Sequence, residues 1–281
     1  MRLILSRKGF DGDAGGAPSP IFEDGTLLSL PIPERGSPRT YGGTTIAGRC
    51  LGPIVEQLTR GRVRAKYGLH LDPDLVPETM PRAPGWRPAF GQAHAAQGVL
   101  AREGITTGDV FVFFGWFRHV KETEKGLAYR RPSPQMHVMF GWLQVGAVFK
   151  PQRDAMPAWT ADHPHVVEPN RTNNTLYVSA PHLTLDGEQL SLPGAGTFTH
   201  YRDALRLTAS GFTRSVWSLP AWFAPREGRL PLSGHSKADR WSLAEGGLRL
   251  RSVGRGQEFV LDMDAYSEAS AWVRSIITAG S

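Results

Sequence analysis

Two runs of almost uninterrupted apolar residues constrain the fold of this chain more than any other feature. The first is Val110–Phe114, and the second spans Met136–Phe149, where Gly141 and Gly146 allow bends or bulges. An apolar side chain at nearly every position is typical of a strand that is covered on both faces. The runs therefore predict central strands in the closed interior of a small barrel or sandwich.

Short strands and turns dominate the rest of the pattern. The chain holds 32 glycines and 22 prolines among 281 residues, which favours many turns over long helices. We find no internal repeat and no long linker, so we expect a single compact domain over residues 1–281 of the β-rich α+β class. A few short helices are predicted at 52–59, 91–102 and 267–279, and further strands at 2–6, 27–30, 175–180, 205–208, 216–219, 248–252 and 258–262.

Membrane and secreted classes are disfavoured by the sequence. No run approaches the roughly 18 to 20 apolar residues that cross a bilayer, and the apolar stretch after Met1 is too short for a signal peptide. A lone cysteine, Cys50, excludes an internal disulfide framework and fits a reducing compartment. We therefore expect a cytoplasmic protein.

Positive charge is concentrated in the middle of the chain. The net charge is +6, and residues 35–131 carry most of the excess. Within them, Arg60, Arg62, Arg64 and Lys66 alternate, and in an extended segment they would share one face suited to a phosphate backbone. A polyanion such as DNA is the partner this pattern favours. The alternative is an ordinary solvated basic surface.

Aromatic side chains follow the first apolar run. Trp116, Phe117 and Arg118 come directly after it, and rings at the end of a strand can stack on a nucleobase, at about 1–3 kcal/mol per base. We expect these three residues to hold a base or a phosphate. The alternative is that the rings simply fill the core.

A dense group of charged residues follows the first predicted strand. Arg7, Lys8 and Asp11 precede a glycine-rich turn and Ser19, and such loops at strand ends often carry sites. The segment matches neither a Walker motif nor a dinucleotide-binding fingerprint. We expect Lys8, Asp11 and Ser19 to take part in catalysis, with Arg7 on the nucleic acid. Alternatively, this is a surface turn that Asp11 caps through its own backbone.

Two histidines flank a proline at His163 and His165, beside Asp162. The sequence lacks the paired-histidine helix motif, the deaminase pattern and a second cysteine, so the known zinc patterns fail. We expect no metal, and acid–base work for His163 and His165. No particular cofactor is indicated.

The sequence resembles the nucleotide modification associated domain 3 family. The resemblance lies in the opening Leu3–Asp11 with the turn after it, in Gly108–Arg118, and in Phe140–Val145, His163–His165 and Gly256–Asp262. It implies a protein of DNA base hypermodification, acting on or recognising a modified nucleobase or nucleotide in DNA. Separately, Gly108-Asp109 before a phenylalanine-rich strand is similar to PUA-like barrels of the ASCH and EVE groups. That likeness implies a partly open barrel with additional strands and aromatic walls around a base.

Three interpretations stay open. We expect an enzyme that modifies a nucleobase, because an acid beside a lysine in a glycine-rich loop suits proton transfer. A non-catalytic reader of modified bases is the second, and a small-molecule hydrolase such as a nucleoside amidohydrolase is the third. The oligomeric state is not indicated.

Overall fold

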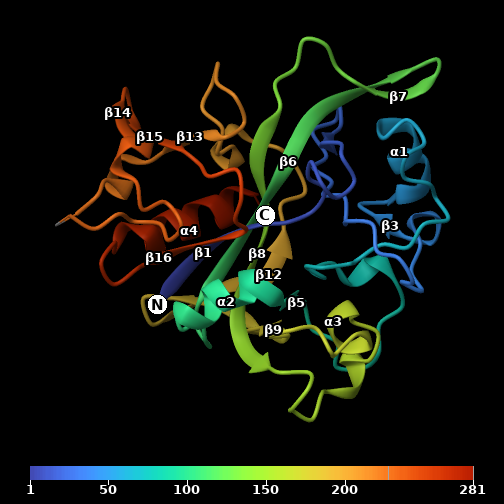
Figure 1. The fold of residues 1–281 in the computed structure, drawn as a ribbon, viewed down its shortest axis with the longest axis horizontal. Helices are drawn as coiled ribbons and strands as arrows, with labels where there is room; N and C mark the ends of the chain where they lie inside the picture. Colours follow the sequence, from blue (N-terminus) through green and yellow to red (C-terminus); the bar gives the residue numbers. More distant parts are fainter. Residues whose placement is uncertain (227, 281) are drawn as a thin grey trace.

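A strand-rich α+β fold is seen in the computed structural model, which describes residues 1–226 and 228–280 (Figure 1). The expected α+β class is confirmed. Within the described residues, the main sheet has nine strands: β1 (Arg2–Arg7), β2 (Ser19–Ile21), β5 (Ala89–Gln92), β6 (Val110–Thr123), β7 (Gly126–Tyr129), β8 (Met136–Phe149), β9 (Thr175–Ser179), β12 (Ala195–Thr197) and β16 (Glu258–Asp262).

Smaller elements pack around this sheet. Three minor sheets are formed by β3 (Thr45–Ile46) with β4 (Arg49–Cys50), by β10 (His182–Leu185) with β11 (Glu188–Pro193), and by β13 (Val216–Leu219), β15 (Gly247–Arg251) and β14 (Trp241–Ala244) in the described part of the chain. The α-helices are α1 (Leu51–Leu58), α2 (His94–Arg102), α3 (Pro164–Val167) and α4 (Glu268–Gly280). Single 3-10 turns lie at 41–43, 77–79, 158–160, 203–205, 221–223 and 238–240.

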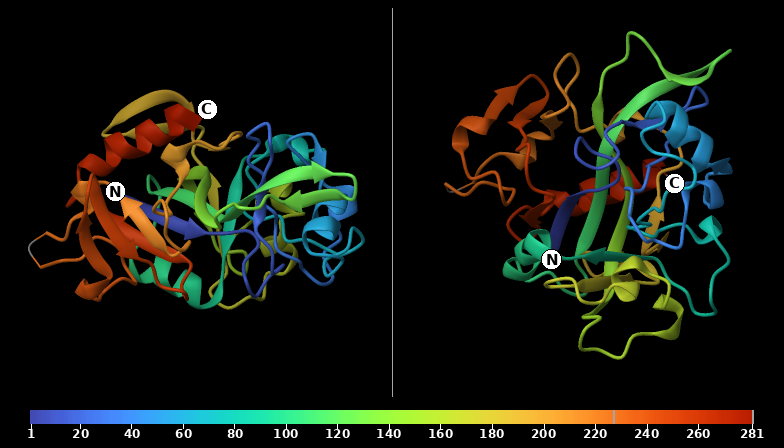
Figure 2. Two further views of the ribbon diagram at one scale, coloured as in Figure 1. Left: turned by 90° about the horizontal axis from the view of Figure 1, so that it is seen from above. Right: turned by 45° about the vertical axis from the view of Figure 1, so that its right-hand side comes forward.

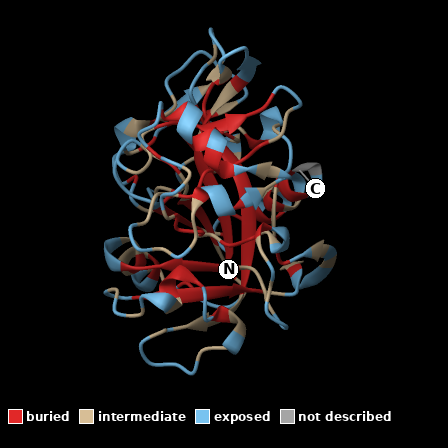
Figure 3. Cartoon of the chain, turned by 90° about the vertical axis from the view of Figure 1, so that its right-hand side faces the viewer, coloured by how far each residue is buried: buried red, intermediate tan, exposed pale blue. Residues whose placement is uncertain are grey.

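The two apolar runs become the long central strands, as predicted. β6 pairs with β8 in antiparallel and with β1 in parallel orientation. The run Val110–Phe114 is buried at every position. The orange and red C-terminal elements lie on one side of the long strands and the blue and cyan N-terminal ones on the other (Figures 1 and 2). Coloured by burial, the chain is buried along the centre of the molecule (Figure 3). The predicted irregularities at Gly141 and Gly146 are confirmed by register shifts beside both glycines.

The main sheet is curled but open. Its strand order runs from β16 through β1, β6, β8 and β9 to β5, and no ladder joins β16 to β5 in the described chain. The two edges still approach each other, because Gln92 of β5 donates a hydrogen bond to Glu258 of β16. The central strands are thus buried on both faces, as expected, but the described sheets are not closed into a barrel, and other elements of the chain cover the two faces. The likeness to PUA-like barrels is not confirmed.

The segment 60–66 does not take the extended form in which its basic side chains would share one face. It is a turn after α1, where Arg60 and Gly61 have positive φ. Their N–H groups bond back to the carbonyls of Gln57 and Glu56, which is the usual C-terminal cap of a helix.

Two predicted strands are wrong. Residues 27–30 form no strand, and Leu27 has only a single bridge to Ile21. Residues 205–208 form a 3-10 turn and single bridges instead of a strand.

No helix in the described residues has both the length and the apolar character needed to span a membrane.

Candidate functional site

A cleft of about 760 Å³, here called the central cleft, opens beside the two edges of the curled sheet. Residues from distant parts of the chain meet there because β1 ends beside the start of β16, where Ser6 pairs with Glu258. The walls include Arg7, Lys8, Asp11, His70, Asp72, Gln92, His165, Arg171 and Glu258.

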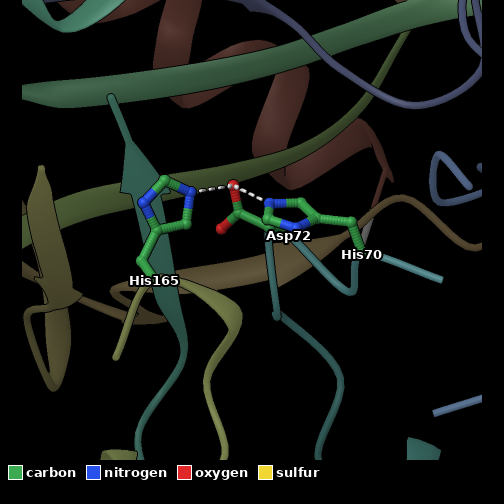
Figure 4. Close-up of side chains that lie close together, drawn as sticks. All are labelled: His70, Asp72 and His165. Carbon is green, nitrogen blue, oxygen red and sulfur yellow. Dashed lines mark ion pairs between the residues drawn. The ribbon is translucent and has the colours of Figure 1, made fainter. Parts of the chain in front are cut away.

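Two histidines and an aspartate converge on one wall of this cleft (Figure 4). His70 and Asp72 are two residues apart in a segment without regular secondary structure, and His165 belongs to α3. Nε2 of His70 and Nε2 of His165 each lie 3.8 Å from Asp72 Oδ2. We call this group the His/Asp cluster.

Hydrogen bonds behind the cluster fix the orientation of each member. His70 Nδ1 donates to Glu34 Oε1 at 2.9 Å, and His165 Nδ1 donates to Asn174 Oδ1 at 2.6 Å. The backbone N–H of Gly91 donates to Asp72 Oδ1 at 2.7 Å. Both imidazoles therefore carry a proton on Nδ1 and turn Nε2 toward Asp72 Oδ2.

Burial and charge give the cluster distinct protonation states. Burial lowers the pKa of His165 to about 4, against the opposing pull of Asp72. Burial also disfavours a charged His70, but Asp72 and Glu34 outweigh it and raise the pKa of His70 to about 9. Burial disfavours an ionised Asp72, yet the three nearby histidines hold the pKa of Asp72 at about 2. The site is thus anionic at its centre and attracts one positive charge, such as a proton on His70.

His163 supports this cluster from behind. Its Nδ1 accepts a hydrogen bond from the backbone N–H of His165 at 3.3 Å, so Nε2 carries the proton. That Nε2 faces Asp72 Oδ1 at 3.6 Å and has no hydrogen-bond partner among the described residues. Burial lowers the pKa of His163 to about 3. His163 does not line the central cleft, so its position suits an orienting role.

A buried ion pair also lines the central cleft. Lys8 Nζ is 2.8 Å from Glu258 Oε1, with 9% and 0% of the two side chains exposed. Gln92 Nε2 donates to the same oxygen at 2.5 Å, and Lys8 Nζ stands 4.7 Å from the ring centre of Phe90. Glu258 Oε2 is buried without a hydrogen-bond partner among the described residues.

A second hollow of about 750 Å³, here called the arginine groove, lies near the C-terminal end of α1 and β7. Arg60, Arg62, Arg118 and Arg131 line it, and none of its described lining residues is acidic. Arg62 donates to the carbonyl oxygen of Gly16 at 2.8 Å. The loop 11–18 separates the two hollows, because its first residues line the central cleft and its last line the groove.

The nucleotide modification associated domain 3 model matches residues 2–262. The chain belongs to this family. The membership gives it a role associated with nucleotide modification, while the choice between enzyme and reader is not shown. No curated protein and no solved structure gives a significant match.

Among the residues predicted for catalysis in this family member, Lys8, Asp11 and His165 meet at the central cleft. Asp11 Oδ1 accepts hydrogen bonds from the N–H groups of Asp13 and Ala14 at 2.9 and 2.7 Å, which is the turn-capping alternative. Ser19 lies apart from them in β2 with 1% exposure, and its Oγ accepts from the N–H of Leu30. A catalytic role suits Ser19 poorly, because its hydroxyl supports the packing of the chain.

The predicted nucleic-acid residues are divided by the fold of this family member. Arg7 lines the central cleft, and Arg60, Arg62 and Arg118 line the arginine groove. Arg64 and Lys66 are exposed and line neither hollow. Trp116 is half-buried and donates from Nε1 to Gln135, whereas Phe117 is fully buried. Phe117 therefore packs in the core, as the alternative reading of the aromatic group proposed.

Sequence reasoning missed His70, Asp72, Gln92 and Glu258. They lie in an irregular segment or at strand ends, and their partners are far away in the chain. One signal was present, because His70-Leu71-Asp72 is a His-x-Asp triplet that puts two polar side chains on one side of an extended segment. The expectation that the chain binds no metal stays a prediction.

Proposed function

We propose that the protein is an enzyme that modifies a nucleobase of DNA and that the central cleft holds the reacting base. The observation that carries this proposal is the gathering of buried charged groups in the lining of one open cleft: the Lys8–Glu258 pair and the His/Asp cluster.

Stability alone is a weak reason for these charges. Removing an ion pair from water costs several kcal/mol per ion, and well-packed apolar residues of similar volume often stabilise as much. The shifted pKa values of His70, Asp72 and His165 at a cleft are instead typical of reactive sites. A volume of about 760 Å³ also falls within the range of small-molecule sites.

The ion pair and the His/Asp cluster suit both recognition of a base and proton transfer. Lys8 and Gln92 donate hydrogen bonds and Glu258 accepts them, which matches the polar edge of a nucleobase. A neutral His165 beside an ionised Asp72 can act as a general base, a role worth about 100- to 10,000-fold in rate.

The arginine groove supports DNA as the source of the base. Four arginines without an acidic neighbour in the described lining suit the phosphates of a polynucleotide. An enzyme that acts on a base in a duplex must take that base out of the stack and into a pocket. The arginine groove would then bind the DNA backbone, and the central cleft, on the other side of the loop 11–18, would hold the extruded base.

The test is the nucleoside mass spectrum of DNA from cells that express the protein, because cells supply any co-substrate. We expect a changed nucleoside with the wild type and with His182→Ala, an exposed histidine outside the cleft. His165→Ala should reduce it at least 100-fold. DNA binding without any changed nucleoside would make the protein a reader. Turnover of free nucleosides with unchanged DNA would make it a small-molecule hydrolase.

A further inference from the structure

We propose that the His/Asp cluster binds one divalent transition-metal ion through Nε2 of His70, Nε2 of His165 and Oδ2 of Asp72. This inference deepens the proposed function and rests on it, since the ion would stand in the wall of the cleft that holds the base. It also departs from the expectation of no metal, which rested on the absence of the known zinc motifs.

The donor atoms have suitable spacing. The possible ligand atoms of the three residues all lie within 4.8 Å of one another, and both Nε2 to Oδ2 distances are 3.8 Å (Figure 4). Metal–ligand bonds of about 2.0–2.2 Å put neighbouring ligand atoms about 3.0–3.5 Å apart. Each Nε2 to Oδ2 distance would therefore have to shorten by about 0.3–0.8 Å for the atoms to close around an ion.

The second layer of hydrogen bonds is the strongest argument. Ligating histidines usually donate their other ring N–H to a carboxylate or carbonyl group, which fixes the tautomer. His70 donates to Glu34, and His165 donates to Asn174. The amide of Asn174 is itself oriented, because its Nδ2 donates to the carbonyl oxygens of His165 and Pro169. Its oxygen must therefore face His165 Nδ1, and the Nε2 lone pair of His165 is left for an ion.

The carboxylate is held in the same way. Asp72 Oδ1 accepts from the N–H of Gly91 and faces the buried Nε2 of His163. Asp72 Oδ2 is left to face the two imidazole nitrogens without a hydrogen bond shorter than 3.5 Å to either. The anionic oxygen and the lone pair on His165 Nε2 repel unless a cation lies between the three groups. In the free protein that cation is the proton on His70, and in the proposed complex it is the metal ion.

The ligand set indicates the class of ion. Two imidazoles and one carboxylate suit iron(II), manganese(II), cobalt(II) or zinc(II), and such a set leaves coordination positions open. Because the cluster lines the central cleft, the open positions would face the substrate. A bound ion there would act as a Lewis acid toward groups in the cleft. Because it would occupy Nε2 of His165, the general base of the proposed function would then be a water on the ion, made acidic by it, with His165 as a ligand.

The test uses purified, chelator-treated full-length protein to which Mn²⁺, Fe²⁺ (without oxygen), Co²⁺ and Zn²⁺ are added separately. We expect at least one of them to bind at about one equivalent per chain, with visible absorption bands of Co²⁺ bound to nitrogen. Asp72→Asn, which keeps the side-chain shape, should weaken binding at least 100-fold. Glu34→Gln should weaken it about 10- to 100-fold, and the exposed His182→Ala should leave it unchanged.

Folded wild-type protein that binds none of the four ions more tightly than Asp72→Asn would overturn the proposal. The Co²⁺ spectrum of the wild type tests the proposal even if a variant fails to fold. A spectrum without nitrogen ligation would also overturn the proposal. Binding of nucleoside monophosphates to the chelator-treated protein separates this inference from the proposed function. Protein that binds none of the ions but still takes the nucleotide refutes the ion and keeps the function. Ion binding together with unchanged cellular DNA keeps the ion and refutes the function.

Discussion

At the scale of single residues, Lys8 shows that the fold, and not the neighbouring sequence, determines the partner of a charged side chain. Its density of charged neighbours after the first strand suggested a site, but its actual partner is Glu258, 250 residues further along the chain. The pairing of Ser6 with Glu258 between β1 and β16 brings the two together. Sequence proximity pointed to Asp11, which instead caps its own turn.

The Lys8–Glu258 pair leads to a prediction on stability. Lys8→Met leaves a carboxylate buried without its charged partner, which should lower the free energy of unfolding by about 3–5 kcal/mol. The double variant Lys8→Met/Glu258→Gln removes both charges and should recover most of that loss. Urea unfolding of the wild type, both single variants and the double variant measures the coupling. Additive losses in the double variant would show that the two residues stabilise the fold independently.

Single residues also show which parts of the candidate site could be predicted from the sequence. His165 was found because two histidines around a proline are conspicuous, and Lys8 because it directly follows a strand. His70 and Asp72 lie in a segment without helix or strand, and their partner in α3 is about ninety residues away. No periodicity connects such positions, because only the path of the backbone through β5 and α3 brings them together.

At the scale of elements, apolar continuity predicted the fold best. β1, β6, β8, β9, β13, β15, β16 and the helices α1, α2 and α4 all fall on stretches that were expected. Alternation of charges at 60–66 did not decide between an extended segment and a loop, and a helix cap sets the backbone there. Burial on both faces also did not require a closed barrel, since loops and α4 cover an open sheet equally well.

The second prediction concerns β5, whose glycine lets α3 approach. A Cβ at Gly91 would clash with the imidazole of His165, so Gly91→Ala should displace His165 and cost about 1–3 kcal/mol. We expect the variant to lose at least tenfold in Co²⁺ affinity and in the yield of the changed nucleoside. Gly98→Ala in α2 is the matched control, because its Cβ meets only the end of Arg102 at 3.5 Å. Equal behaviour of the two variants would argue against a role for this close approach.

At the scale of the whole molecule, the loop 11–18 stands between two hollows of similar size and different character. The central cleft is lined by both acidic and basic residues, while the charged residues in the described lining of the arginine groove are all basic. Tyr129 of β7 donates to the carbonyl oxygen of Pro18, which ties the loop to the groove side. The proposed binding of a DNA backbone and the proposed chemistry on a base can therefore be tested separately by mutation.

The last prediction tests this separation by comparing two pairs of basic residues. Arg60 and Arg131 line the arginine groove, whereas Arg64 and Lys66 are equally exposed but lie outside it. Each phosphate contact adds about 0.7–0.9 to the slope of log affinity against log salt concentration. Arg60→Gln/Arg131→Gln should therefore flatten the slope for a labelled oligonucleotide by about 1.5. Arg64→Gln/Lys66→Gln removes the same net charge and should leave the slope nearly unchanged, which fluorescence anisotropy at several salt concentrations measures. Equal flattening in both double variants would mean that DNA senses the general charge of this region and not the groove.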